Sequence, residues 1–129
     1  MSSTEASWTF SRMVDHDALG QELYNAMRKQ RPVDPLNGRF ALTIEDAYRI
    51  SRSMLERRLL DGERIIGKKI GVTSPAVQNM LGVHQPDFGY LTDAMLVDGE
   101  MPVSKLLIQP RAEGEIAFTL SKELMGPGI

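Results

Sequence analysis

The apolar positions of this chain recur with a helical period in its first half and with a period of two from about residue 64 onward. The apolar residues of a first predicted helix share one face: Leu19, Leu23 and Met27. Either Asp15 or Asp17 can cap the start of this helix. Residues 1–14 show no such pattern, so we expect a flexible N-terminal tail there.

A second helix is predicted to begin after Thr43, whose hydroxyl can cap it, with Glu45 and Asp46 in its first turn. It ends at Asp61-Gly62, where glycine can adopt the left-handed conformation. The residues expected on its buried face are Ile44, Ala47, Tyr48, Ser51, Leu55 and Leu59.

Beyond the second helix the pattern favours β-structure. Residues 64–72 alternate as a strand, and Ser74-Pro75 then opens a short helix that Gly82 ends. Residues 83–90 are expected to form a loop.

The last third of the chain is predicted to be a hairpin-type turn at Asp98-Gly99 and a strand over 106–120. The fold class is therefore α+β, with two N-terminal helices followed by a β-rich part. Because Gly-Pro-Gly near the end normally leads into further structure, we expect the chain to be the first part of a longer protein.

Composition narrows the classes of function. The chain has 129 residues, 42% hydrophobic and 25% charged, with a formal net charge of −2. The basic residues are spread out and no apolar run is long enough to cross a bilayer, so we expect neither nucleic acid nor a membrane as a partner. There is no cysteine and no signal peptide, so the expected location is cytoplasmic.

The predicted strand over 106–120 carries the first candidate site. Its alternation places Glu113 and Glu115 side by side on one face. Two neighbouring carboxylates repel each other unless a cation lies between them, and a hard ion such as Mg²⁺ or Mn²⁺ suits such ligands. The residues alone leave open the alternative of a strand with one solvated face.

Lys69 and Asp87 are the other candidates. Lys69 lies between Gly67 and Gly71 on one strand face, which leaves room for its side chain to reach a ligand, although a strand-edge charge that prevents aggregation fits equally well. Asp87 lies in a Pro-Asp-Phe-Gly run, where a turn residue is the simpler interpretation.

Three further polar residues are weaker candidates. We expect His84 to be a loop residue and Asp93 to be a cap, and Arg111 either neutralises a carboxylate or lies on the surface.

Three segments together resemble one family: residues 67–74 (GKKIGVTS), 82–89 (GVHQPDFG) and 108–118 (IQPRAEGEIAF). They are similar, in order and spacing, to the 2-hydroxypenta-2,4-dienoate (2-keto-4-pentenoate) hydratases of the fumarylacetoacetate hydrolase-like group. The resemblance runs from about Leu19 to Gly128. It implies a mixed sheet of that fold, of which residues 15–129 would be the N-terminal part of a single hydratase domain.

The resemblance also implies an activity and its residues. Family members are lyases that add water to 2-hydroxypenta-2,4-dienoate, giving 4-hydroxy-2-oxopentanoate, in the meta-cleavage catabolism of aromatic compounds. The resemblance assigns the binding of Mg²⁺ or Mn²⁺ to Glu113 and Glu115, and it assigns proton transfer to Lys69 and Asp87. It further implies homo-oligomers and, in some pathways, association with the pathway decarboxylase.

Two features keep other functions open. Family members are about twice as long, and their third metal-binding carboxylate comes from later in the chain than Ile129. The alternatives are a metal-dependent 4-oxalocrotonate decarboxylase, whose relatives tend to lack the QPDFG run, and a truncated, non-catalytic chain, either a gene fragment or a subunit that only binds a partner.

Overall fold

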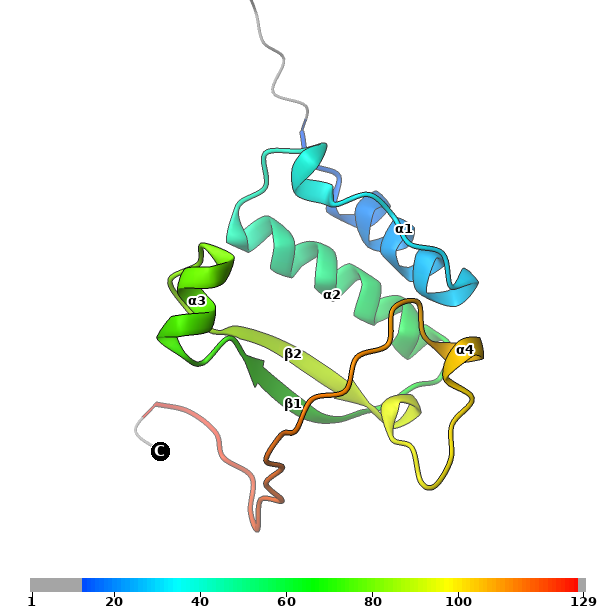
Figure 1. Cartoon of the computed structure of the whole chain (residues 1–129), viewed down its shortest axis with the longest axis vertical. Coiled ribbons are helices and arrows are strands. Elements are labelled where there is room, and N and C mark those ends of the chain that lie inside the picture. The colour runs from blue at the N-terminus through cyan, green and yellow to red at the C-terminus, as the bar shows by residue number, and fades with distance from the viewer. Residues whose placement is uncertain (1–12, 128–129) are drawn as a thin grey trace, which may run out of the picture.

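The structure is a computed structural model, and it describes residues 13–127. Two long helices, α1 (His16–Lys29) and α2 (Ile44–Leu60), lie side by side, and α2 lies between α1 and a pair of antiparallel strands, β1 (Ile65–Gly71) and β2 (Asp87–Thr92) (Figure 1). The remaining elements are short: the 3₁₀ helices Leu36–Gly38 and Asp93–Met95, α3 (Pro75–Leu81) between the strands, and α4 (Val103–Leu106). The predicted α+β class is confirmed.

The helix caps agree with the sequence. The Asp15 carboxylate accepts a hydrogen bond from the Ala18 N–H at 2.9 Å, so α1 begins at the first of its two candidate caps. Thr43 and Asp46 form a reciprocal capping box at the start of α2. At the other end, Gly62 has φ +96°, the left-handed conformation expected after a helix.

The two long helices run in the same direction and approach closely at Gly20. A Cβ atom there would lie 2.4 Å from the Ser53 Oγ and 3.0 Å from the Ile50 carbonyl oxygen, so only glycine allows this approach. Leu19 and Ile50 are the buried apolar residues of this contact. The helix pair therefore contains most of the apolar packing that the structure describes.

The expected buried face of α2 is wrong in part. Ile44 and Tyr48 are 58% and 38% exposed, and the buried residues of α2 are instead Ile50, Ser53 and Arg58. The reason is that α1 packs on the face that carries Ile50, while the face that carries Tyr48 and Ser51 turns toward the strands.

The strand predicted over 64–72 is confirmed as β1, and the short helix after Ser74-Pro75 is confirmed as α3. The loop expected over residues 83–90 is wrong at its end, because Asp87 opens β2 and pairs with Gly71. Its turn-forming neighbours Pro86 and Gly89 predicted a loop locally, but pairing with β1 satisfies the backbone and decides the conformation.

The β-structure expected after residue 95 is absent from the described chain. Gly99 has φ +85° as in a turn, but no strands flank it, and residues 107–127 form an exposed irregular segment instead of the strand predicted over 106–120. The expected mixed sheet is likewise not found, since the sheet of residues 13–127 has two antiparallel strands only. A strand needs a neighbouring backbone to pair with, and this segment has none there.

Two expectations concern the ends and the surroundings of the chain. The tail predicted over 1–14 lies outside the described residues except for its last two positions, where Met13 is 91% exposed. In the described part of the chain, no helix has the length and apolar character needed to cross a membrane.

Candidate functional site

The strand pair brings together the two residues predicted for proton transfer. In the antiparallel register Lys69 lies opposite Gly89 and Asp87 lies opposite Gly71, so both side chains are on the same face of the pair. The Nζ of Lys69 lies 3.9 Å from the Oδ1 of Asp87, and the two side chains are 50% and 58% exposed. A cation and a carboxylate at this separation, open to solvent, can exchange protons with a small ligand.

Glycines on both strands make room for this pair. A Cβ atom on Gly71 would lie 2.3 Å from the Asp87 Oδ1 and 2.8 Å from the Lys69 Nζ. One on Gly89 would lie 3.1 Å from the Lys69 Cγ. The space predicted beside Lys69 is therefore real, and it is filled by the side chains of the pair itself.

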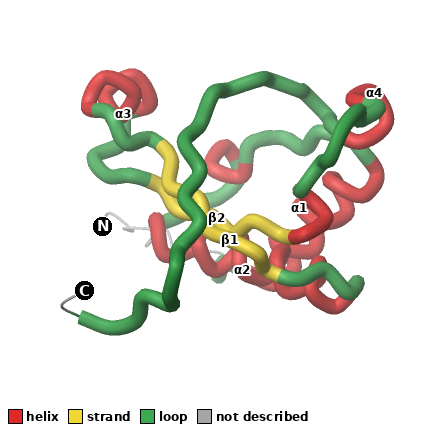
Figure 2. Tube along the Cα trace, turned by 90° about the horizontal axis from the view of Figure 1, so that it is seen from below, coloured by secondary structure: helices red, strands yellow, loops and turns green. Residues whose placement is uncertain are grey.

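The pair lies on the face of the strands that points away from α2. Thr92 is fully buried, and its Oγ1 accepts a hydrogen bond from the Arg58 guanidinium at 2.8 Å, so the face of β2 that carries Thr92 turns toward α2. Asp87 has the opposite parity along the strand. Figure 2 shows the strands from that outer side, where the irregular segment after α4 crosses them in the view.

Two polar contacts attach β2 to α2. At one end of β2, the backbone N–H of Phe88 donates to the Tyr48 hydroxyl at 3.1 Å. At the other end, Glu63 accepts hydrogen bonds from Arg58 at 2.8 Å and from the Thr92 hydroxyl at 2.6 Å. Burial acts to raise the pKa of Glu63, but these two hydrogen bonds and the Arg58 charge outweigh burial and lower that pKa.

The predicted metal ligands are not assembled into a site in the described chain. Glu113 and Glu115 are both exposed, in the irregular segment and not on a strand. Within residues 13–127, no group of three or more His, Cys, Asp or Glu side chains is arranged to hold a metal ion. Two exposed carboxylates two residues apart suit a hard divalent ion in their chemistry, but they do not complete its ligands.

The weaker candidates lie apart from the pair. His84 and Arg111 are exposed in irregular segments. Asp93 lies at the far end of the strand pair, where the backbone N–H of Arg64 donates to its carboxylate at 2.9 Å and lowers its pKa. Its role is to join the end of β2 to the start of β1.

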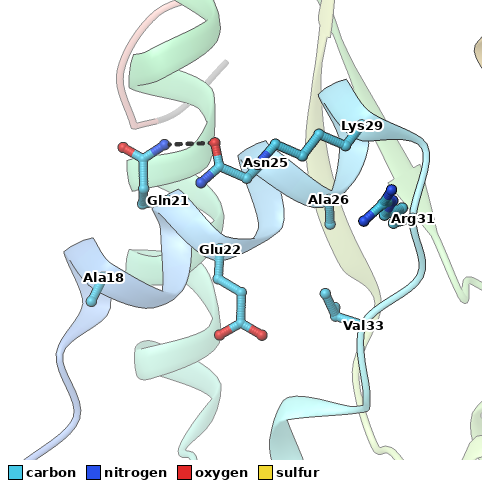
Figure 3. Close-up of a pocket in the computed structure, with 8 residues that line it drawn as sticks. All are labelled: Ala18, Gln21, Glu22, Asn25, Ala26, Lys29, Arg31 and Val33. Atoms are coloured by element: carbon cyan, nitrogen blue, oxygen red, sulfur yellow. Dashed lines mark hydrogen bonds between the residues drawn. The ribbon is translucent and has the colours of Figure 1, made fainter.

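Two of the hollows on the described surface differ in their relation to the candidate site. One hollow, of about 410 Å³, lies beside α1 and the loop that follows this helix. Two of its lining residues are shown in Figure 3, where the Gln21 side-chain amide donates a hydrogen bond to the Asn25 Oδ1. The other, of about 300 Å³, lies between α2 and the strands, and its lining includes Tyr48, Lys68 and Lys69. The second hollow adjoins the candidate site, and the first does not.

Sequence reasoning missed the residues that hold β2 in place. Tyr48 was assigned to an apolar face, and Arg58 and Thr92 carried no motif. The only available signal was an arginine near the end of a helix, which is also typical of an exposed position favoured by the helix dipole.

The chain is homologous to hydratases of 2-hydroxydienoate compounds over about 85% of its length. It is 70% identical over 114 residues to the 2-hydroxypent-2,4-dienoate hydratase of Pseudomonas putida, a match that covers 86% of this chain and 51% of the relative. It is 58% identical over 114 residues to the 2-hydroxyhexa-2,4-dienoate hydratase of Comamonas testosteroni, covering 85% of this chain and 43% of that one. The chain thus spans about half the length of the curated relatives it matches. No protein-family model matches it.

Among solved structures, the chain resembles the 4-oxalocrotonate decarboxylase from Pseudomonas putida G7 in complex with magnesium and adipate. The TM-score is 0.59 at 30% sequence identity, over 61% of this chain and 30% of that one. A second structure of the same decarboxylase, with calcium and acetate, matches equally well.

Proposed function

We propose that this chain is part of a lyase that adds water to 2-hydroxypenta-2,4-dienoate to give 4-hydroxy-2-oxopentanoate, in the meta-cleavage catabolism of aromatic compounds. One observation carries the proposal: Lys69 and Asp87 lie together over Gly71, in a chain 70% identical to a hydratase with this type of substrate. The names of the relatives support the substrate class.

Lys69 and Asp87 would move the protons of this reaction. The 2-hydroxyl group of the dienol loses its proton and C5 gains one, which gives a conjugated ketone. Water then bonds to C4 through its oxygen while C3 takes up a proton. A positioned acid–base group typically contributes 10²–10⁴-fold to such steps.

Glu113 and Glu115 would supply two of the ligands of a divalent metal, Mg²⁺ or Mn²⁺. The donor chemistry supports this, as do the metal ions in the related decarboxylase structures. A bound metal of this kind stabilises negative charge on the carboxylate and 2-oxygen of a 2-oxo acid. The remaining ligands would come from outside the described residues.

We also propose that residues 15–129 form part of a single domain with the fumarylacetoacetate hydrolase-like fold, which the solved decarboxylase supports only at the level of overall likeness. Assembly into homo-oligomers, and association with a pathway decarboxylase, belong to the same proposal. The large exposed apolar residues of the strand pair support such contacts, among them Ile66, Ile70 and Phe88.

The loss of the ultraviolet absorbance of the dienol tests the activity, with Mg²⁺ or Mn²⁺ and then with EDTA. Metal-dependent loss, with 4-hydroxy-2-oxopentanoate as the product, is the expected result. Replacing Lys69 or Asp87 should lower the rate of this loss by about 10²–10⁴-fold, whereas Lys68→Met is the matched control because Lys68 lies on the opposite face of β1. No turnover, beside an active full-length relative, would favour the non-catalytic alternative.

The second candidate is decarboxylation of 4-oxalocrotonate, favoured by the likeness to a solved decarboxylase. The sequence identity of 30% is much lower than the 70% to the hydratase. Release of CO₂ from 4-oxalocrotonate, without hydration of the dienol, would support this candidate instead.

A further inference from the structure

We infer that Tyr48 is a positioning residue for Asp87, an inference that rests on the proposed function of the Lys69–Asp87 pair. The Tyr48 hydroxyl accepts a hydrogen bond of 3.1 Å from the N–H of Phe88, the residue directly after Asp87. This bond fixes the peptide that joins Asp87 to Phe88, and thereby the direction in which the Asp87 side chain leaves the strand.

Asp87 needs such a tether because it lies at the end of the sheet. Its pairing with Gly71 is the last of the β1–β2 register, and an exposed irregular segment precedes it. Strand ends open more readily than strand centres, so the pair would otherwise depend on a fraying end. The neighbouring N–H of Phe88 bonds to α2, which extends the support beyond the two strands.

The spacing of the two contacts with α2 matches the geometry of both elements. Tyr48 and Arg58 are ten residues apart on α2, about 15 Å along a helix axis. Their partners Phe88 and Thr92 are four residues apart on β2, about 13 Å along a strand. Helix and strand therefore run alongside each other, held at both ends, and Tyr48 holds the end that carries Asp87.

The contact also defines how Tyr48 reaches Asp87. Tyr48 and Lys69 both line the hollow between α2 and the strands, but the hydrogen bond of Tyr48 goes to the N–H of Phe88, which lies on the strand face opposite to Asp87. Tyr48 thus acts on Asp87 through the backbone of β2.

Amide exchange of the 129-residue chain, measured by NMR, tests the tether without any need for activity. Tyr48→Phe should make the Phe88 amide exchange about fivefold faster, the effect of one net hydrogen bond, and should remove the cross-peak between the Lys69 and Asp87 side chains. Tyr24→Phe is the matched control, because it also removes a hydrogen-bonded tyrosine hydroxyl. The Tyr24 hydroxyl, on α1, donates to the Asp61 carboxylate and has no contact with β2 in the hydrogen bonds of the described chain. Unchanged exchange at Phe88 in the Tyr48 variant would overturn the tether.

A double-mutant cycle on turnover separates positioning from general stability. If Tyr48 acts through Asp87, Tyr48→Phe lowers kcat several-fold in the parent chain and has no further effect in an Asp87→Asn background. Equal losses in both backgrounds would overturn the positioning role. An inactive parent chain would count against the proposed function, and the side-chain cross-peak would then decide the inference by itself.

Discussion

Replacing Gly71 with alanine is expected to separate Lys69 from Asp87 while the strand pair stays folded. The new Cβ would lie 2.3 Å from the Asp87 Oδ1, about 1 Å short of an ordinary contact, and 2.8 Å from the Lys69 Nζ. Both atoms are ends of side chains that are at least half exposed, so they can rotate away. The steric conflict is thus relieved at the site and not in the backbone.

The two effects of this substitution differ in size. A displacement of about 1 Å in a catalytic group can lower turnover about 10²-fold. Stability should change by no more than about 1 kcal/mol, since alanine is favoured over glycine inside a strand by about 0.5–1 kcal/mol and the displaced side chains reach solvent. Activity should therefore fall much further than stability.

Turnover of the dienol and urea unfolding measure the two effects in parallel. Gly67→Ala is the matched control on the same strand face, because its Cβ would meet the Leu91 side chain at ordinary distances, 3.6 Å to the Cδ1 and 3.8 Å to the Cβ. It should keep its activity. The reasoning would be refuted if the Gly71→Ala chain turned over the dienol at the parental rate. It would also be refuted if the loss in its free energy of unfolding were large enough to account for the loss of activity.

Four further predictions concern stability and metal binding. Arg58→Met should destabilise the fold by about 2–3 kcal/mol in urea, because it removes the guanidinium 2.7 Å from the Glu63 carboxylate, which is 9% exposed, and leaves the Arg28 guanidinium at 3.2 Å as its remaining cation; a loss below 1 kcal/mol would contradict this. The folded-state pKa of Glu63 is lowered, so its stabilisation is present above its unfolded pKa of about 4.3 and is lost as the pH falls through the folded value; Glu63→Gln should flatten the fall of Tm below about pH 4.3. Gly20→Ala should destabilise the helix pair by about 1–3 kcal/mol through its conflict with Ser53, and an unchanged Tm would show that the helices can move apart. Glu115→Gln should weaken Mn²⁺ binding in calorimetry, and equal affinity in both chains would remove Glu115 from the metal ligands.

Elements set by local chemistry could be predicted from the sequence alone. Asp15 and Thr43 cap the two long helices as expected, and Gly62 and Gly82 end helices in the left-handed conformation. A cap depends on hydrogen bonds between residues three positions apart, so the information lies within a few residues. The space beside Lys69 could also be predicted locally, because Gly67 and Gly71 are each only two residues away from it.

Only the tertiary structure decided which helix faces and strands pack against one another. The faces of α2 could not be ranked from its periodicity, because the helix contacts both α1 and the strands. Asp87 looked like a turn residue until β1 supplied a backbone to pair with, and that pairing is what places it beside Lys69. Conversely, the alternation around Glu113 and Glu115 predicted a strand, but in the described residues 13–127 this segment is irregular and pairs with no strand. Alternation indicates which face a strand would bury, but only a neighbouring backbone makes it a strand.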